Sequence, residues 1–145
     1  MIEAKVIEWA ATLVTPPEFT FLPYGLWSED TTMRFYAPAR ESDASFSIDN
    51  IQGTTDYFEG DCRTVESIMA MCGHTRLDLI KLDIEGAEGP VVDAMLASEI
   101  RPTVIAVEFD LPEFPWKTRA RIRRICDAGY DVASVEDRNY VFVHR

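Results

Sequence analysis

Carboxylate side chains gather at the end of one apolar run in this sequence. The run "LIKLDIEGAEGP" spans residues 79–90, and its apolar pattern gives way to Asp83, Glu85 and Glu88 around Gly86. An ionised carboxylate can accept a proton as a general base, and it can stabilise a nearby cation. The spacing therefore predicts a site that handles protons or positive charge where a buried strand ends.

A second apolar run ends in the same way. "TVIAVEFD", residues 103–110, finishes with Glu108 and Asp110. Open α/β sheets bind ligands beyond the carboxyl ends of their strands, so acids at two neighbouring strand ends would line one crevice. Two like charges about 4 Å apart repel by roughly 4 kcal/mol at an effective dielectric constant near 20, so a cation should offset them. Lys81, a metal ion or a positively charged cofactor could each do so.

The individual acids have competing interpretations. We expect Asp83 and Glu108 to face a ligand, because each lies at the polar end of one strand face. Glu88 is better explained by a helix N-terminus, where a carboxylate interacts favourably with the dipole. A divalent-cation site that adds Glu85 and Asp110 to the same oxygen cluster is a separate alternative.

The surrounding hydrophobic pattern predicts the elements that must position these acids. Apolar residues at helical spacing predict helices near residues 2–13, 65–72, 90–96 and 122–126. Thr64 is a suitable N-cap for the second helix, and Gly73 is suited to end it. Strands are predicted at residues 19–25, 33–38, 77–84 and 103–110, followed by a closing hairpin of residues 131–136 and 140–145.

Helices that alternate with nearly continuous apolar strands are typical of a parallel sheet covered on both faces. We therefore predict an α/β fold with a mostly parallel sheet and an antiparallel hairpin at its C-terminal edge. A further hairpin is favoured between residues 19–25 and 33–38, and the polar residues 39–61 are interpreted as a long surface loop. A chain of 145 residues has the length of one domain.

Composition excludes several classes of function. The net charge is −11, which disfavours nucleic acid as a partner because phosphate binding needs a basic surface. No run approaches the roughly 18 apolar residues of a membrane span, and the charged N-terminus does not resemble a signal peptide, so we expect a cytoplasmic protein without a membrane partner. The three cysteines and two histidines are widely spaced, which supports neither a disulfide framework nor a zinc site, and we predict no metal.

The same residues carry a resemblance to a known family. "RTVESIMAMCGHTRLDLIKLDIEGAEGPVVDAML", residues 63–96, resembles the signature region of FkbM-like methyltransferases, with "LIKLDIEGAE" as its most specific part. Residues 18–36 and "VIAVEFD", residues 104–110, are similar to the segments before and after it. Such proteins resemble class I S-adenosylmethionine-dependent methyltransferases, which have a Rossmann-like seven-stranded sheet and mostly act on oxygen. The resemblance thus implies S-adenosyl-L-methionine as the cofactor.

The resemblance assigns roles position by position. Asp83 and Glu85 would lie where the methyl group is transferred, near the cationic sulfonium, and either could orient or deprotonate a substrate hydroxyl. Asp83 would thus be both a catalytic and a cofactor-binding residue. Glu108 would line the substrate side, while Gly25 and Leu26 would lie towards the adenine.

Members of the family also carry an upstream strand and glycine-rich turn that hold the cofactor, and this sequence has neither. We therefore expect residues 1–145 to form a single FkbM-like domain that is N-terminally truncated relative to the family. A partial class I sheet of this kind should bind S-adenosylmethionine weakly or not at all by itself, because the missing glycine-rich turn supplies the close backbone approach and the helix N-terminus that such cofactors use. A fragment, a domain completed by another chain and a degenerate relative remain open explanations.

Two functions of different classes follow. The first is S-adenosylmethionine-dependent methylation of a hydroxyl on a small molecule or sugar by an incomplete domain. The alternative is a catalytically inactive remnant that acts in self-association or partner binding, since unpaired sheet edges invite pairing. The expected protein partner is accordingly either a second copy of the chain or a completing chain.

Overall fold

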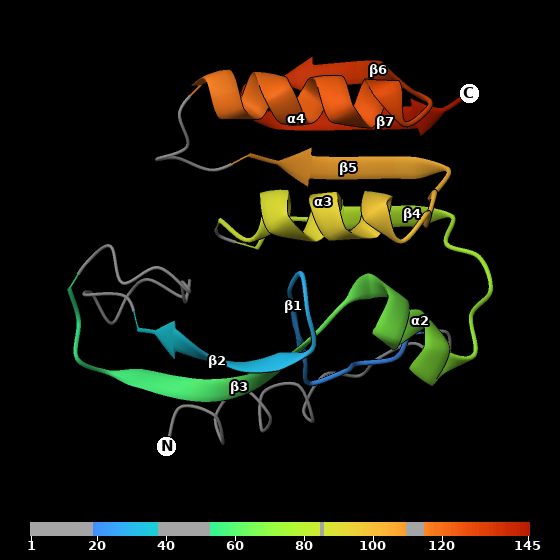
Figure 1. The fold of residues 1–145 in the computed structure, drawn as a ribbon. Helices are drawn as coiled ribbons and strands as arrows, with labels where there is room; N and C mark the ends of the chain where they lie inside the picture. Colours follow the sequence, from blue (N-terminus) through green and yellow to red (C-terminus); the bar gives the residue numbers. More distant parts are fainter. Residues whose placement is uncertain (1–18, 38–52, 85, 110–114) are drawn as a thin grey trace.

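The computed structural model describes residues 19–37, 53–84, 86–109 and 115–145. These residues form two β-sheets and three α-helices (Figure 1). The predicted α/β class is confirmed, but the sheets are mixed rather than mostly parallel, and there are two of them rather than one. The helix predicted for residues 2–13 lies outside the described residues.

The first sheet has three strands in the order β1-β3-β2. Its strands are β1 (Gly25–Leu26), β2 (Thr31–Tyr36) and β3 (Tyr57–Arg63). β3 pairs parallel with β1 and antiparallel with β2. The hairpin predicted between residues 19–25 and 33–38 is therefore wrong, because β3 lies between the two segments.

β3 also corrects the long loop predicted for residues 39–61, whose last residues belong to this strand. Phe35 of β2 and Phe58 of β3 are partners in register, and their rings stack with centroids 5.1 Å apart. Gly60 makes room for this pair, since a Cβ atom there would come within 3.1 Å of the Phe35 ring. The glycine that disguises the strand in the sequence is thus required by the packing of its neighbour.

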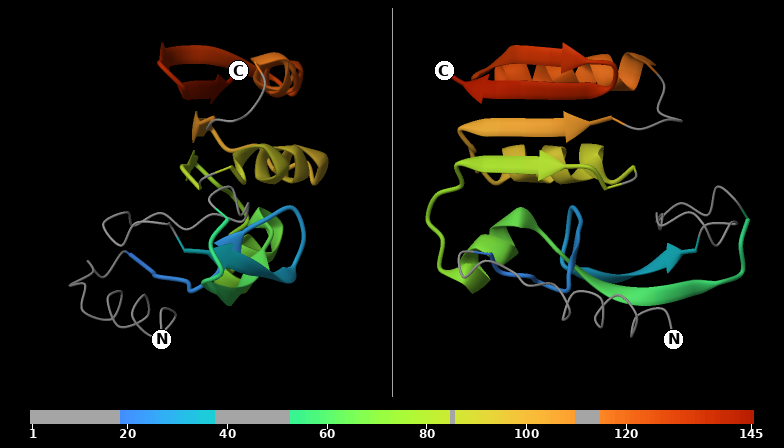
Figure 2. Two further views of the ribbon diagram at one scale, coloured as in Figure 1. Left: turned by 90° about the vertical axis from the view of Figure 1, so that its left-hand side faces the viewer. Right: turned by 180° about the vertical axis from the view of Figure 1, so that it is seen from behind.

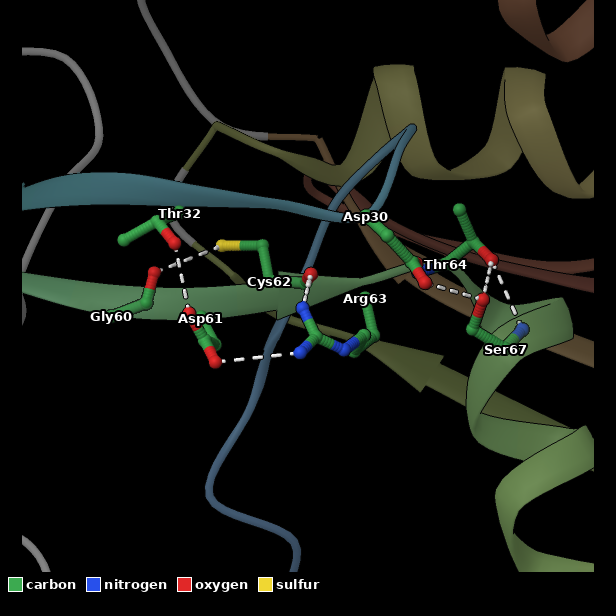
Figure 3. A network of polar contacts seen from close by, with 8 residues as sticks. All are labelled: Asp30, Thr32, Gly60, Asp61, Cys62, Arg63, Thr64 and Ser67. Atoms are coloured by element: carbon green, nitrogen blue, oxygen red, sulfur yellow. Dashed lines mark hydrogen bonds and ion pairs between the residues drawn. The ribbon is translucent and has the colours of Figure 1, made fainter.

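A polar network joins the first sheet to helix α2 (Val65–Cys72), which follows β3 directly (Figure 3). The Thr64 hydroxyl accepts a hydrogen bond from the Ser67 backbone N–H at 3.0 Å, as predicted for an N-cap, and Gly73 ends the helix at φ 69°. The Asp30 carboxylate accepts from the Thr64 backbone N–H at 2.9 Å and from the Ser67 hydroxyl at 2.8 Å. These two bonds, the Thr64 bond foremost, hold the pKa of Asp30 below its usual value.

The second sheet has four strands in the order β4-β5-β7-β6. Its strands are β4 (Leu79–Leu82), β5 (Val104–Glu108), β6 (Tyr130–Glu136) and β7 (Asn139–His144). β4 and β5 are parallel, while β7 runs antiparallel to both β5 and β6. The predicted C-terminal hairpin is confirmed, and so is the parallel pairing of the two acid-ended strands.

Helices α3 (Glu88–Ala97) and α4 (Pro115–Asp127) connect these strands and lie on the same face of the second sheet (Figure 2). Between the helices and the sheet lies the apolar core, in which Leu82, Ile105 and Phe142 are fully buried. On the opposite face Leu79 is 57% exposed and Val143 38% exposed. The sheet was predicted to be covered on both faces, but the helices that the structure describes cover only one.

Candidate functional site

The predicted acids lie at the carboxyl ends of two adjacent parallel strands. Glu108 is the last residue of β5, and Asp83 follows β4 directly. The register pairs Leu82 with Val107, so one further step along both strands sets Asp83 beside Glu108. The structure therefore brings these two residues together at one end of the sheet, whereas Glu85 and Asp110 lie outside the described residues.

Both carboxylates have a cationic neighbour. Lys81 Nζ donates a hydrogen bond to Asp83 Oδ2 at 2.8 Å. Lys81 is one of the cations that were expected from the sequence to offset the charge of the acids. Both side chains of this pair are largely exposed, Lys81 at 61% and Asp83 at 48%. Glu108 is less exposed, and its Oε1 lies 3.5 Å from a guanidinium nitrogen of Arg138. Each of the two acids at this end of the sheet is thus paired with one cation from the chain itself.

Sequence reasoning did not find Arg138. It lies in the turn between β6 and β7, and its backbone carbonyl accepts a hydrogen bond from Phe109 N–H at 3.0 Å. That turn reaches the site because β7 pairs with β5, with Asn139 opposite Glu108. The turn itself was predicted, but its place beside β5 depends on the strand order, which no local pattern in the sequence specifies.

Glu88 differs from the other acids because its side chain is buried. It is 2% exposed, and its carboxylate accepts hydrogen bonds from the backbone N–H groups of Ile84 at 2.7 Å and Gly86 at 3.0 Å. As the first residue of α3 it also lies at the positive end of the helix dipole, where the sequence placed it. Its bonds to the preceding turn were not foreseen. The left-handed φ of 103° at Gly86 makes them possible.

Gly25 and Leu26 lie in the other sheet, on β1. A Cβ atom at residue 25 would come within 2.9 Å of Cys62 Sγ and 3.0 Å of the Phe35 ring, so the glycine has a packing reason of its own. Leu26 packs against the hydrophobic core. Gly25 also lines a cavity of ≈ 570 Å³, whose lining contains neither Asp83 nor Glu108.

That cavity is walled mainly by aromatic and aliphatic side chains. Its lining comprises Phe21, Leu22, Pro23, Tyr24, Gly25, Phe35, Phe58, Glu59, Gly60 and Asp61. The two acids in this set are already engaged, because Glu59 pairs with Arg34 at 3.2 Å and Asp61 with Arg63 at 3.3 Å. Its volume is that of a small-ligand pocket, and its walls suit a flat apolar ring.

The site shows no metal-binding geometry in the part of the chain that is described. Across residues 19–37, 53–84, 86–109 and 115–145, no three His, Cys, Asp or Glu side chains converge as metal ligands would. Two of the four oxygen donors in the cation-site alternative, Glu85 and Asp110, belong to residues that the structure does not describe. The described pair alone carries too few ligands for calcium or magnesium.

The two acids lie at adjacent carboxyl ends of a parallel strand pair, which is the end of the sheet where open α/β proteins bind their ligands. Comparison with known families gives the particular family: the model of the methyltransferase FkbM domain matches residues 16–132. This match spans more than half of the chain, which therefore belongs to the FkbM methyltransferase domain family, as its sequence resemblance predicted. No curated protein and no solved structure matches the chain. Among the described helices, none combines the length and the apolar character needed to cross a membrane.

Proposed function

We propose that the chain takes part in S-adenosylmethionine-dependent transfer of a methyl group to a hydroxyl of a small molecule or sugar. The observation that carries this proposal is the pairing of Asp83 with Glu108 at adjacent carboxyl ends of parallel strands, in a chain of the FkbM methyltransferase domain family. Family membership supports methyl transfer, and the acidic end of the sheet supplies the residues that an acceptor hydroxyl needs.

The donor set fits a positively charged cofactor. Asp83 and Glu108 carry two carboxylates at one place, and among the described contacts the exposed Lys81 ammonium pairs with Asp83 and Arg138 pairs with Glu108. When bound, S-adenosylmethionine supplies a methyl group activated by a positively charged sulfur. A cation of that kind can share the exposed Asp83 carboxylate with Lys81.

The chain's own contribution is to orient the acceptor and to take its proton. Lys81 engages Oδ2 of Asp83, so Oδ1 would be the oxygen that takes the proton of the acceptor hydroxyl. Glu108, half-buried beside it, accepts a hydrogen bond from a second polar group of the acceptor. Positioning carries much of the rate in methyl transfer, and a carboxylate base adds about 10²- to 10⁴-fold.

The cofactor's adenine belongs, in this proposal, with Gly25 and Leu26. The cavity beside Gly25 supports it, because its aromatic walls suit a flat ring. We further propose that the second sheet is the substrate-side part of a Rossmann-like sheet, and that the reaction takes place in the cytoplasm. The free thiols of Cys62, Cys72 and Cys126 are consistent with a reducing compartment.

Transfer of a radiolabelled methyl group tests the proposal directly. The purified protein is incubated with S-[methyl-³H]adenosylmethionine and a panel of sugars, small-molecule alcohols, amines and thiols, and base-stable label is counted in each acceptor. We expect label in at least one hydroxyl acceptor, with S-adenosylhomocysteine as the stoichiometric product. Label confined to amines or thiols would reject O-methylation, and no transfer together with no cofactor binding by calorimetry would reject the function.

The exposed face of the second sheet favours one further candidate function, association with a second copy of the chain. Leu79 and Val143 are apolar and exposed there, and β4 is an edge strand in the sheet as described. Sedimentation at micromolar concentration would show a dimer that Leu79→Asn weakens. A monomeric wild-type protein would exclude this candidate.

A further inference from the structure

Glu88 makes contacts that an ordinary helix-capping carboxylate does not make. A capping side chain usually accepts from N–H groups within the first turn of the helix that it begins. Glu88 instead reaches back out of α3, and the two hydrogen bonds that its carboxylate accepts from described residues, Ile84 and Gly86, come from the turn between β4 and α3. Its bonds therefore fix the turn in addition to any effect on the helix.

Burial makes these bonds strong and their loss costly. The side chain is 2% exposed, so the carboxylate exchanges its water for two charge-assisted N–H bonds and the dipole of a 10-residue helix. Removing the carboxylate would leave two N–H groups pointing into a space without an acceptor. The turn would then have to rearrange or admit another anion.

The turn that Glu88 holds carries a proposed catalytic group. Asp83 immediately precedes Ile84, so the Ile84 N–H belongs to the peptide unit that joins the two residues. The direction of this N–H therefore fixes how that peptide unit is turned relative to the Asp83 side chain. With that N–H turned inward to Glu88, the Asp83 carboxylate stays on the exposed face beside Lys81. The two carboxylates thus have opposite places: one is buried under the turn, and the other is presented above it.

We propose that Glu88 is a positioning residue for the methyl-transfer site, a built-in anion that locks the turn after β4 and so orients Asp83. This inference rests on the proposed function for its catalytic consequence, while its structural part can be measured without any turnover.

Chemical rescue distinguishes this role from simple packing. Glu88→Ala removes a fragment with the shape and charge of acetate, so added acetate can refill the site, whereas acetamide has the shape without the charge. We expect amide hydrogen exchange at Ile84 and Gly86 to become about 10- to 100-fold faster in the variant, and acetate at about 0.1 M to reverse most of the change. Acetamide and sodium chloride at equal concentration should not reverse it.

Asp93→Ala is the matched control, because it removes a carboxylate from the same helix. The Asp93 carboxylate forms an ion pair with Arg124 of α4 at 2.9 Å and takes no part in the bonds that hold the turn. Amide exchange at Ile84 and Gly86 should therefore stay unchanged in Asp93→Ala. Glu88→Gln decides the matter if Glu88→Ala does not fold. A glutamine side chain has one acceptor oxygen instead of two, so it can keep only one of the two hydrogen bonds from the turn. Amide exchange at the turn should therefore become about 3- to 10-fold faster. Unchanged exchange in a folded Glu88 variant would overturn the proposal.

Kinetics provides the functional readout. In the methyl-transfer assay Glu88→Ala should lower kcat about 10-fold or more with a much smaller change in KM for the acceptor, and acetate should raise kcat again. If the wild-type protein transfers no methyl group while the exchange results hold, the proposed function fails and the locking role of Glu88 stands. If exchange responds but kcat does not, Glu88 holds the turn without positioning Asp83 and the inference is wrong.

Discussion

Replacing Asp83 by Asn should separate catalysis from stability. The substitution keeps the size of the side chain and removes its ability to take a proton. Asp83 and its partner Lys81 are both largely exposed, and an ion pair of that kind contributes at most about 1 kcal/mol to folding. We therefore expect the melting temperature of Asp83→Asn to lie within a few degrees of the wild-type value.

The catalytic cost should be much larger. A general base contributes about 10²- to 10⁴-fold, which corresponds to roughly 2.7–5.4 kcal/mol of barrier at 1.36 kcal/mol per factor of ten. The assay compares initial rates of methyl transfer at saturating cofactor over a range of pH. Asp83→Asn should lose at least 100-fold in kcat at every pH at which the wild-type protein is active.

Asp78→Asn is the matched control for charge. Asp78 lies just before β4 and pairs with Arg76 at 3.0 Å, with both side chains exposed. The Asp78→Asn substitution makes the same change in net charge beside β4, but at the end of that strand opposite to the site. It should therefore leave kcat unchanged. Retention of more than half of the wild-type rate in Asp83→Asn would remove Asp83 from the catalytic residues. An equal loss in both variants would trace the effect to net charge.

Three further predictions concern groups whose surroundings the structure defines. Tyr130→Phe should lower the free energy of unfolding by about 1–2 kcal/mol in urea titrations, because its buried hydroxyl donates to a backbone carbonyl at 2.7 Å that would lose its partner; an unchanged midpoint would contradict this. Burial raises the pKa of the Cys62 thiol, so iodoacetamide near pH 8 should label exposed Cys72 well before Cys62 in the folded protein, with equal labelling in denaturant as the control. Hydrogen bonds lower the pKa of Asp30 in the folded protein, so the stability that its carboxylate contributes is complete above the unfolded pKa near 4 and is lost as the pH falls through the lower folded pKa. The difference in free energy of unfolding between wild type and Asp30→Asn should therefore shrink between about pH 5 and pH 2. A difference that did not depend on pH would refute the assignment.

The candidate site was predictable to the extent that it depends on strand alternation. In β4 the sequence alternates between the buried Ile80 and Leu82 and the exposed Leu79 and Lys81, and this period of two places Asp83 on the exposed side. The apolar length of the two runs identified buried neighbours, and parallel pairing then set the acids side by side. Local pattern was sufficient here because both acids follow directly from their own strands.

Prediction failed where one element depends on another that is distant in sequence. β3 contains Glu59, Gly60 and Asp61, which resemble a turn when considered alone. The strand forms because its alternate residues pack against β2, and its glycine accommodates the ring of Phe35. Arg138 and the inward reach of Glu88 have the same origin, since both contacts require a fold that brings the partners together.

The exposed face of the second sheet carries the residues of both candidate functions, methyl transfer and self-association, at opposite ends of its strands. The register aligns Leu79 with Val104 and Val104 with Val143 across three strands, so one end of this face is an apolar row. At the other end of the same strands the row is acidic, with Asp83 beside Glu108. An apolar row favours burial against another surface, while an acidic row needs water or a cation. Because the rows lie at opposite ends of β4, Leu79→Asn should weaken association without changing methyl transfer. Asp83→Asn should lower methyl transfer without changing association. A variant that lost both activities together would mean that association completes the site.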